Sequence, residues 1–176
     1  MSTQAGLMTV EEFLKLPPAK EGHYELHRGE VILVPPAKRG LQRGQARIHN
    51  ALFRLAGEKG EVGTEYAFQP TPDYNVWEAD VAFVRAEREK AVGDDEYLLG
   101  APDLVVEVLS PSNTADEMND RMAICLENGC LSFWVVDQKR KRLSVTEGNV
   151  TRHYGISDSF HCGVLDATIQ VREIFE

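Results

Sequence analysis

Two carboxylates lie inside apolar segments of the sequence, where a negative charge needs a partner. Glu107 is in the middle of segment 103–112, and Asp80 stands near the start of segment 79–84. Both segments have the length and β-branched content of short buried strands. If these strands are neighbours, Asp80 and Glu107 meet, and two adjacent carboxylates repel each other unless a cation lies between them. Carboxylate oxygens are the ligands that Mg²⁺ prefers, so the pair predicts a metal site.

Length and composition restrict the class of protein. A chain of 176 residues with 43% hydrophobic content can bury one core, so we expect a single domain over residues 1–176. Neither a signal peptide nor a long apolar run is present, which predicts a cytoplasmic protein that does not enter membranes. The net charge of −9 argues against a protein that coats nucleic acid through bulk charge, but allows a local basic patch.

The three cysteines do not suggest a disulfide framework or a zinc site. Cys125, Cys130 and Cys162 are odd in number and lack C-x-x-C spacing. We therefore expect buried free thiols.

Capping and turn signals place the elements that must position the two acids. Thr9 and Glu12 form a capping box before a short helix over about 10–16, and Gly29 marks the turn of a hairpin over 23–34. Longer helices are predicted over 41–59 and, after the N-cap oxygens of 112–114, over 115–128. Further strands are expected at 65–69, 131–137, 143–146 and 150–154, with a polar connection at 86–100 and a terminal segment at 169–175. This order predicts an α/β (α+β) fold with a mixed central sheet flanked by helices.

Basic residues gather just before and along the first long helix. They are Lys38, Arg39, Arg43, Arg47 and Arg54. Such a group is typical of a solvated helix face, and it also suits phosphate binding; both interpretations remain open.

The predicted hairpin carries a polar face formed by His23, Glu25 and His27. Such a face is usually solvated, although Glu25 adds a third acid to the candidate set. Phosphate-binding glycine loops, the nucleophile elbow and the H-E-x-x-H zinc motif are all missing from the sequence, so common nucleotide-binding and hydrolase classes lack support.

Several segments together resemble the Uma2 family (DUF820) of restriction-endonuclease-like proteins, within the PD-(D/E)xK nuclease superfamily. The specific part is the block 101–112, APDLVVEVLSPS. Weaker similarity extends over nearly the whole chain, through 8–13, 24–26, 29–30, 79–84, 133–137 and 173–175.

This resemblance implies a restriction-endonuclease-like core and a DNA endonuclease activity that depends on Mg²⁺ or Mn²⁺. Asp80, Glu107 and the Val108 carbonyl would hold the metal, and Glu25 would be an outer acid. DNA is the implied substrate, with Lys38, Arg39, Arg43 and Arg47 as candidate contacts. The resemblance also implies a homodimer, since cleavage of both strands needs two sites.

Two positions depart from the family pattern. Arg121 stands where the family has a Lys on the helix after the Glu strand, and Gln45 stands where it has a His. An arginine matches phosphate well but cannot exchange a proton as a lysine can, so activity would be reduced or lost.

Three alternatives to an active nuclease follow from the same residues. The first is a degenerate member of the fold that only binds nucleic acid or a protein. The second is a glycosidase that uses two carboxylates, although no aromatic platform for sugars is recognisable near Asp80. In the third, Glu107 pairs with Arg121 or another cation only to stabilise the fold.

Overall fold

The computed structural model describes residues 6–110 and 113–176, so Pro111 and Ser112, at the end of the family-like block, lie outside the described residues. Within this part of the chain, seven strands form one mixed sheet. They are β3 (Gly60–Gln69), β4 (Trp77–Arg85), β5 (Leu98–Leu99), β6 (Leu104–Val108), β7 (Ser132–Asp137), β8 (Arg142–Glu147) and β9 (Val150–Gly155). Their order across the sheet is β5-β3-β4-β6-β7-β8-β9. The predicted fold class, a mixed central sheet flanked by helices, is thus confirmed.

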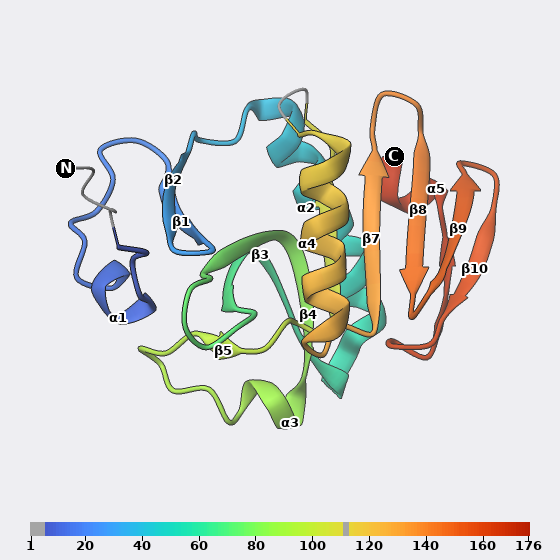
Figure 1. Ribbon diagram of the computed structural model, residues 1–176. Coiled ribbons are helices and arrows are strands. Elements are labelled where there is room, and N and C mark those ends of the chain that lie inside the picture. Colours follow the sequence, from blue (N-terminus) through green and yellow to red (C-terminus); the bar gives the residue numbers. More distant parts are fainter. Residues whose placement is uncertain (1–5, 111–112) are drawn as a thin grey trace.

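The centre of the sheet combines both kinds of strand pairing. Strand β6 is antiparallel to β4 on one side and parallel to β7 on the other. Parallel neighbours need a crossover, and α4 (Ala115–Glu127) supplies it. In Figure 1, α4 covers the front of the sheet and α2 (Arg39–Ala56) lies behind it. The two helices therefore enclose β4 and β6, the strands that carry Asp80 and Glu107.

Each face of the sheet has its own apolar core. On the α2 side, Ile48 and Leu52 pack with Val106 and other strand residues, and on the α4 side Cys125 packs with Val105. Successive side chains of a strand point to opposite faces of the sheet, so neighbouring residues of β6 pack in different cores. Because every residue of β6 is buried, any charge on it is removed from bulk water.

A small hairpin lies beside the large sheet. Strands β1 (His23–His27) and β2 (Glu30–Val34) pair in antiparallel fashion around Arg28 and Gly29, which both have positive φ (50° and 82°). Two such residues form the tight hairpin turn that matches strand twist. Reciprocal backbone hydrogen bonds of 2.8 and 2.9 Å between Leu26 and Val76 join the hairpin to the segment before β4. This connection places the polar face of β1 over the start of β4.

Short elements complete both ends. Helix α1 (Val10–Phe13) has the predicted capping box but ends three residues before the expected Leu16. At the C-terminal end, β10 (Ser159–Cys162) pairs with β11 (Ala167–Gln170), and α5 (Arg172–Phe175) packs on the α2 side. All three cysteines are free and buried, as expected.

Element boundaries differ from the predictions in places where short-range signals are weak. Helix α2 begins at Arg39 and ends at Ala56, where a 3-10 turn (Gly57–Lys59) replaces the expected last turn. Strand β3 starts at Gly60 rather than near Glu65, because its first half is held by pairing with β4. The polar connection holds α3 (Ala86–Glu89) and β5. None of the described helices is both long and apolar enough to span a membrane.

Candidate functional site

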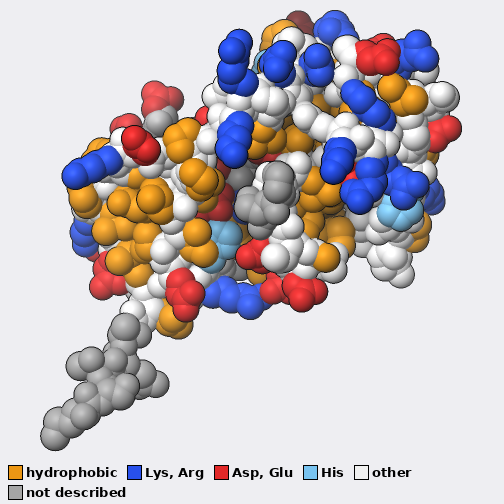
Figure 2. Space-filling model, turned by 90° about the horizontal axis from the view of Figure 1, so that it is seen from above, with side chains coloured by type: hydrophobic (Ala, Val, Ile, Leu, Met, Phe, Trp, Pro, Cys, Tyr) orange, Lys and Arg blue, Asp and Glu red, His pale blue; other side chains and the backbone are white. Residues whose placement is uncertain are grey.

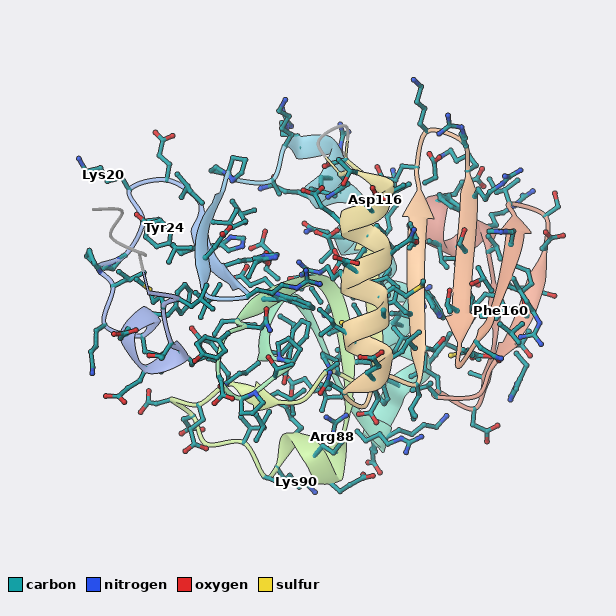
Figure 3. All side chains as sticks on the ribbon, viewed as in Figure 1. Lys20, Tyr24, Arg88, Lys90, Asp116 and Phe160 are labelled. Atoms are coloured by element: carbon teal, nitrogen blue, oxygen red, sulfur yellow. The ribbon has the colours of Figure 1, made fainter. Side chains whose placement is uncertain are left out.

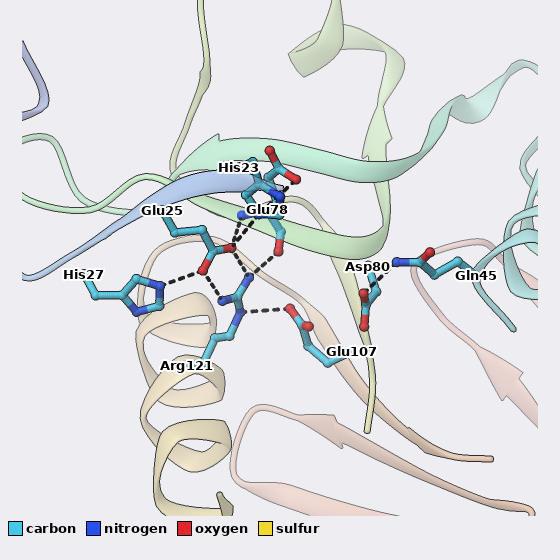
Figure 4. A network of polar contacts seen from close by, with 8 residues as sticks. All are labelled: His23, Glu25, His27, Gln45, Glu78, Asp80, Glu107 and Arg121. Atoms are coloured by element: carbon cyan, nitrogen blue, oxygen red, sulfur yellow. Dashed lines mark hydrogen bonds and ion pairs between the residues drawn. The ribbon is translucent and has the colours of Figure 1, made fainter. Parts of the chain in front are cut away.

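Asp80 and Glu107 lie at the same end of two paired strands. The β4–β6 ladder runs from Phe83 opposite Leu104 to Val81 opposite Val106, and the two acids are the next residues along. Residues opposite each other in an antiparallel pair are close neighbours. Figure 4 shows the two carboxylates beside each other, as the strand pattern predicts.

Strand β4 changes face at Asp80. Ala79 packs in the core on the α4 side, whereas Val81 packs in the core on the α2 side, although alternate residues of a regular strand share a face. Opposite this point, Glu65 of β3 has a φ of 49°. Ladder pairs are formed by Thr64 and Tyr66 on either side of it. This local irregularity directs Asp80 to the junction between both layers of helices.

The Asp80 carboxylate is held by two neutral donors. Gln45 of α2 donates through Nε2 to Oδ1 at 2.7 Å, and the backbone N–H of Val108 donates to Oδ2 at 2.6 Å. Gln45 is itself buried, so its amide has a fixed position. These two bonds orient Asp80 without neutralising its charge.

Glu107 is paired with Arg121, which projects from α4. Arg121 Nε donates to Glu107 Oε1 at 2.8 Å, and the remaining guanidinium nitrogens reach the two oxygens of Glu25 at 3.3 and 3.4 Å. A further bond goes to the Glu78 carbonyl, and the guanidinium lies over the Trp77 ring at 5.1 Å from the centroid. Arg121, whose side chain is 14% exposed, therefore bridges two buried acids from different elements.

Glu25 has more partners than any other acid of the site. His27 contacts it at 2.6 Å, His23 lies 4.0 Å away, and the Glu78 backbone N–H donates to it at 2.7 Å. Contrary to the expectation of a solvated face, Glu25 is only 5% exposed. The polar face of β1 is covered because it packs against β4 and α4, and Figure 4 shows the resulting network.

The pKa values of the two acids that share Arg121 shift in opposite directions. Burial alone would raise the pKa of Glu25, but Arg121, His23 and His27 together hold it well below its usual range. Burial raises the pKa of Glu107 to about 8, which Arg121 only partly offsets and the nearby Asp80 charge reinforces. Burial also raises the pKa of Asp80. Glu25 and Glu107 thus share one arginine, whereas the partly buried Asp80 is held by neutral donors.

A buried acid at the other end of β6, Asp103, is paired with two arginines. Asp103 contacts Arg88 at 3.0 Å and Arg85 at 3.7 Å, and also accepts the Arg85 backbone N–H. Figure 3 labels Arg88 at the opposite end of the sheet from the candidate site. Asp103 is therefore a structural ion pair, separate from the Asp80–Glu107 pair.

The structure brings most predicted site residues together. Glu25, Gln45, Asp80, Glu107 and Arg121 form one connected region, and the Val108 backbone joins it through its N–H. Lys38, Arg39, Arg43 and Arg47 are exposed on the first half of α2, outside the network. No group of three or more His, Cys, Asp or Glu side chains in the described residues is arranged to hold a metal ion.

Sequence reasoning missed Glu78, Trp77 and the involvement of both histidines in the site. Glu78 lies one residue before the predicted start of its strand, and its side chain contacts His23 at 3.2 Å. The spacing H-x-E-x-H on a strand was the one sequence pattern that could have pointed to this part of the site. It indicates a buried polar network only when a cation, here Arg121, is known to face the strand.

The raised pKa of Glu107 predicts a pH-dependent stability. Between about pH 4.5 and pH 8 the native carboxyl holds a proton that the unfolded chain has lost, so the free energy of unfolding falls as pH rises through this window. In Glu107→Gln this loss is absent, and the variant should gain on the order of a few kcal/mol relative to the original protein between about pH 5 and pH 9. Urea unfolding of both proteins at the two pH values measures the difference. A constant difference would contradict the prediction, and Asp137→Asn, a change at an ion pair outside the site, serves as control.

Comparisons with known proteins agree with this geometry. The sequence model of the Uma2 family, described as "Putative restriction endonuclease", matches residues 10–165. A solved structure described as "a putative nuclease belonging to DUF820" from Anabaena variabilis ATCC 29413 has the same fold, with a TM-score of 0.80 and 17% identity. The alignment covers 96% of this chain and 97% of that chain. No curated protein matches. Since the family match spans most of the sequence and the fold agrees, the chain belongs to the Uma2 family.

Proposed function

We propose that the protein is a DNA endonuclease that hydrolyses phosphodiester bonds with a divalent metal ion, Mg²⁺ or Mn²⁺, at Asp80 and Glu107. The observation that carries this proposal is the convergence of three carboxyl groups, Glu25, Asp80 and Glu107, at the ends of β4 and β6 with one guanidinium among them. One guanidinium serves Glu25 and Glu107 together, while Asp80 receives only neutral donors. A site of this kind attracts a further cation.

The donor set fits a hard cation. Magnesium in nucleases is commonly bound by one or two carboxylates, with water and substrate phosphate completing its six ligands. Asp80 and Glu107 provide the carboxylates, and the second oxygen of Glu107 has no hydrogen bond within the described residues. The Val108 carbonyl is proposed as a further ligand. The chemistry that such an ion supplies is activation of water and screening of the phosphate charge.

The remaining residues position and balance this site. Gln45 orients Asp80, and Glu25 fixes Arg121 so that its charge stays close to Glu107. Arginine keeps its charge at any physiological pH, which makes Arg121 suitable for stabilising the charge that develops on a phosphate. DNA is the proposed substrate because the exposed basic residues of α2 lie on the helix that carries Gln45. The homodimer stays a prediction.

Plasmid nicking tests the proposal. With Mg²⁺ or Mn²⁺, the protein should convert supercoiled plasmid to the open circle, and EDTA should stop the reaction. Glu107→Ala removes one metal ligand and should lower the rate at least about tenfold. Nicking that survives this substitution would mean that the activity does not come from this site. Asp103→Asn is a matched control, since it changes a buried acid that lies just before the same strand and outside the site.

A binding-only role on the same fold is the second candidate. It is favoured by the full engagement of Arg121, whose nitrogens contact Glu25, Glu107 and the Glu78 carbonyl. A cation held in this way neutralises the acids and keeps only one N–H, on Nη1, for a phosphate. In this case DNA binds and no condition gives cleavage.

A further inference from the structure

Two stretches of this acidic chain contain basic residues and no acids. Segment 31–57 has no Asp or Glu, and neither does segment 138–146. Together they hold nine of the 19 Lys and Arg residues of a protein whose net charge is −9. The first segment includes most of α2, and the second forms the turn between β7 and β8. The basic residues of the second segment are Lys139, Arg140, Lys141 and Arg142.

The two segments are in contact in the fold. A Cβ atom placed on Gly44 of α2 would lie 1.4 Å from Nε2 of Gln138, so the Gln138 side chain at the start of the turn packs directly on the helix. One turn further along α2, Arg47 donates to the Phe175 carbonyl at 3.3 Å, and Lys141 donates to the same oxygen at 3.4 Å. The β7–β8 turn and the first half of α2 are therefore one continuous surface.

Much of the charge on this surface is not neutralised by the protein. Arg140 pairs with Asp137 at 2.8 Å. Other basic residues of the surface are exposed and form no ion pair within the described part of the chain: Lys38, Arg39, Arg43, Lys139 and Lys141. Figure 2, which views the molecule from the end where this turn lies, shows Lys and Arg side chains gathered over one part of that face. Unpaired cations of like sign this close together favour a polyanion as partner.

The surface leads directly to the candidate site. Gly44 contacts the turn, and the next residue, Gln45, donates to Asp80. On the sheet, Val108 is paired with Val136, and the turn begins two residues after Val136. A chain of phosphates lying on the turn and α2 would therefore continue towards Asp80 and Glu107.

We propose that the β7–β8 turn is a second phosphate-contacting element, which together with the start of α2 binds the backbone of a DNA duplex. This inference rests on the proposed function, because it takes DNA as the ligand of the neighbouring site. It adds Lys139 and Lys141, which no motif of the sequence assigned to DNA. Contacts of this kind set affinity and orientation and carry no base specificity.

The test measures binding without cleavage. Fluorescence anisotropy of a labelled duplex is recorded in EDTA over a range of KCl concentrations for the original protein and for the double variant Lys139→Gln with Lys141→Asn. Asparagine is chosen at position 141 because Lys141 has a φ of 52°, which Asn tolerates better than most residues. Loss of two phosphate contacts should weaken binding roughly tenfold and reduce the slope of log K against log salt by about 2.

Controls separate this proposal from the proposed function. Lys90→Ala removes an exposed lysine that Figure 3 places beside α3, at the end of the molecule opposite the turn, and should leave affinity and slope unchanged. Lys139→Glu alone provides a second variant that leaves Lys141 and its contact with Phe175 intact, and it should also weaken binding. If the double variant and Lys139→Glu bind like the original protein, the proposal is overturned. Binding that depends on the turn in a protein that never nicks DNA would uphold this inference and reject the endonuclease.

Discussion

Arg121→Ala should destabilise the fold by about 3–5 kcal/mol, because it leaves two buried acids without their shared cation. Glu25 is 5% exposed and Glu107 is 8% exposed, so neither can regain the solvation that the guanidinium replaces. The variant also loses the bond to the Glu78 carbonyl and the contact with Trp77. Urea unfolding at neutral pH measures the change.

The matched control is an exposed ion pair that involves the neighbouring residue of the same helix. Asp120 pairs with Arg28 at 3.1 Å, but both side chains are more than 60% exposed. Solvent screens such a pair, and Arg28→Ala should cost no more than about 1 kcal/mol. The pH dependence separates the cost of unpaired buried charge from the cost of lost side-chain contacts. If unpaired charge dominates, the Arg121→Ala protein should recover stability as pH falls and its acids take up protons. An Arg121→Ala protein as stable as Arg28→Ala would show that the acids do not depend on the cation.

The meeting of Asp80 and Glu107 could be predicted from sequence because both acids stand in short apolar strands. The apolar composition of these strands predicts that both acids are buried. That the two acids are neighbours needs only the assumption that the two strands pair. Helix α4 was also predictable, since Thr114 and Glu117 form a capping box whose bonds depend on residues three apart. The resemblance to a nuclease family, confirmed by the family match, implied a restriction-endonuclease-like core but not the order of its strands. The predicted metal and the cytoplasmic location stay predictions.

The network around Glu25 could not be predicted because it depends on contacts between distant segments. Arg121 and Glu25 are 96 residues apart, and the face of β1 that carries Glu25 has the polar pattern of a solvated strand. Only the bridge between Leu26 and Val76 turns that face towards β4. The change of face at Asp80 was equally hidden, since it coincides with a positive φ at Glu65 on the neighbouring strand, far from Asp80 in the sequence.

Arg121→Lys combined with Gln45→His should raise metal-dependent nicking by about 100-fold if these two departures from the family pattern are what limits the site. The Arg121 Nε–H occupies Glu107 Oε1, and a lysine has no donor at that point of its side chain. Glu107 would then be free to hold a metal ion, while the lysine ammonium keeps one positive charge near Glu25. A histidine at position 45 can still donate to Asp80, and it adds a group that exchanges protons near neutral pH.

The single variants separate the two effects. If charge pairing at Glu107 limits the site, Arg121→Lys alone should give most of the gain; if proton exchange limits it, Gln45→His should contribute independently. Each protein is first checked by circular dichroism and urea unfolding, because Arg121→Lys weakens a buried ion pair and lowers stability. A folded double variant that binds DNA yet nicks no faster than Glu107→Ala would contradict the endonuclease, since the site would then have both family residues and still lack activity. The buried Glu25–Arg121–Glu107 bridge would in that case serve the fold, and the basic surface of α2 and the β7–β8 turn would carry the function.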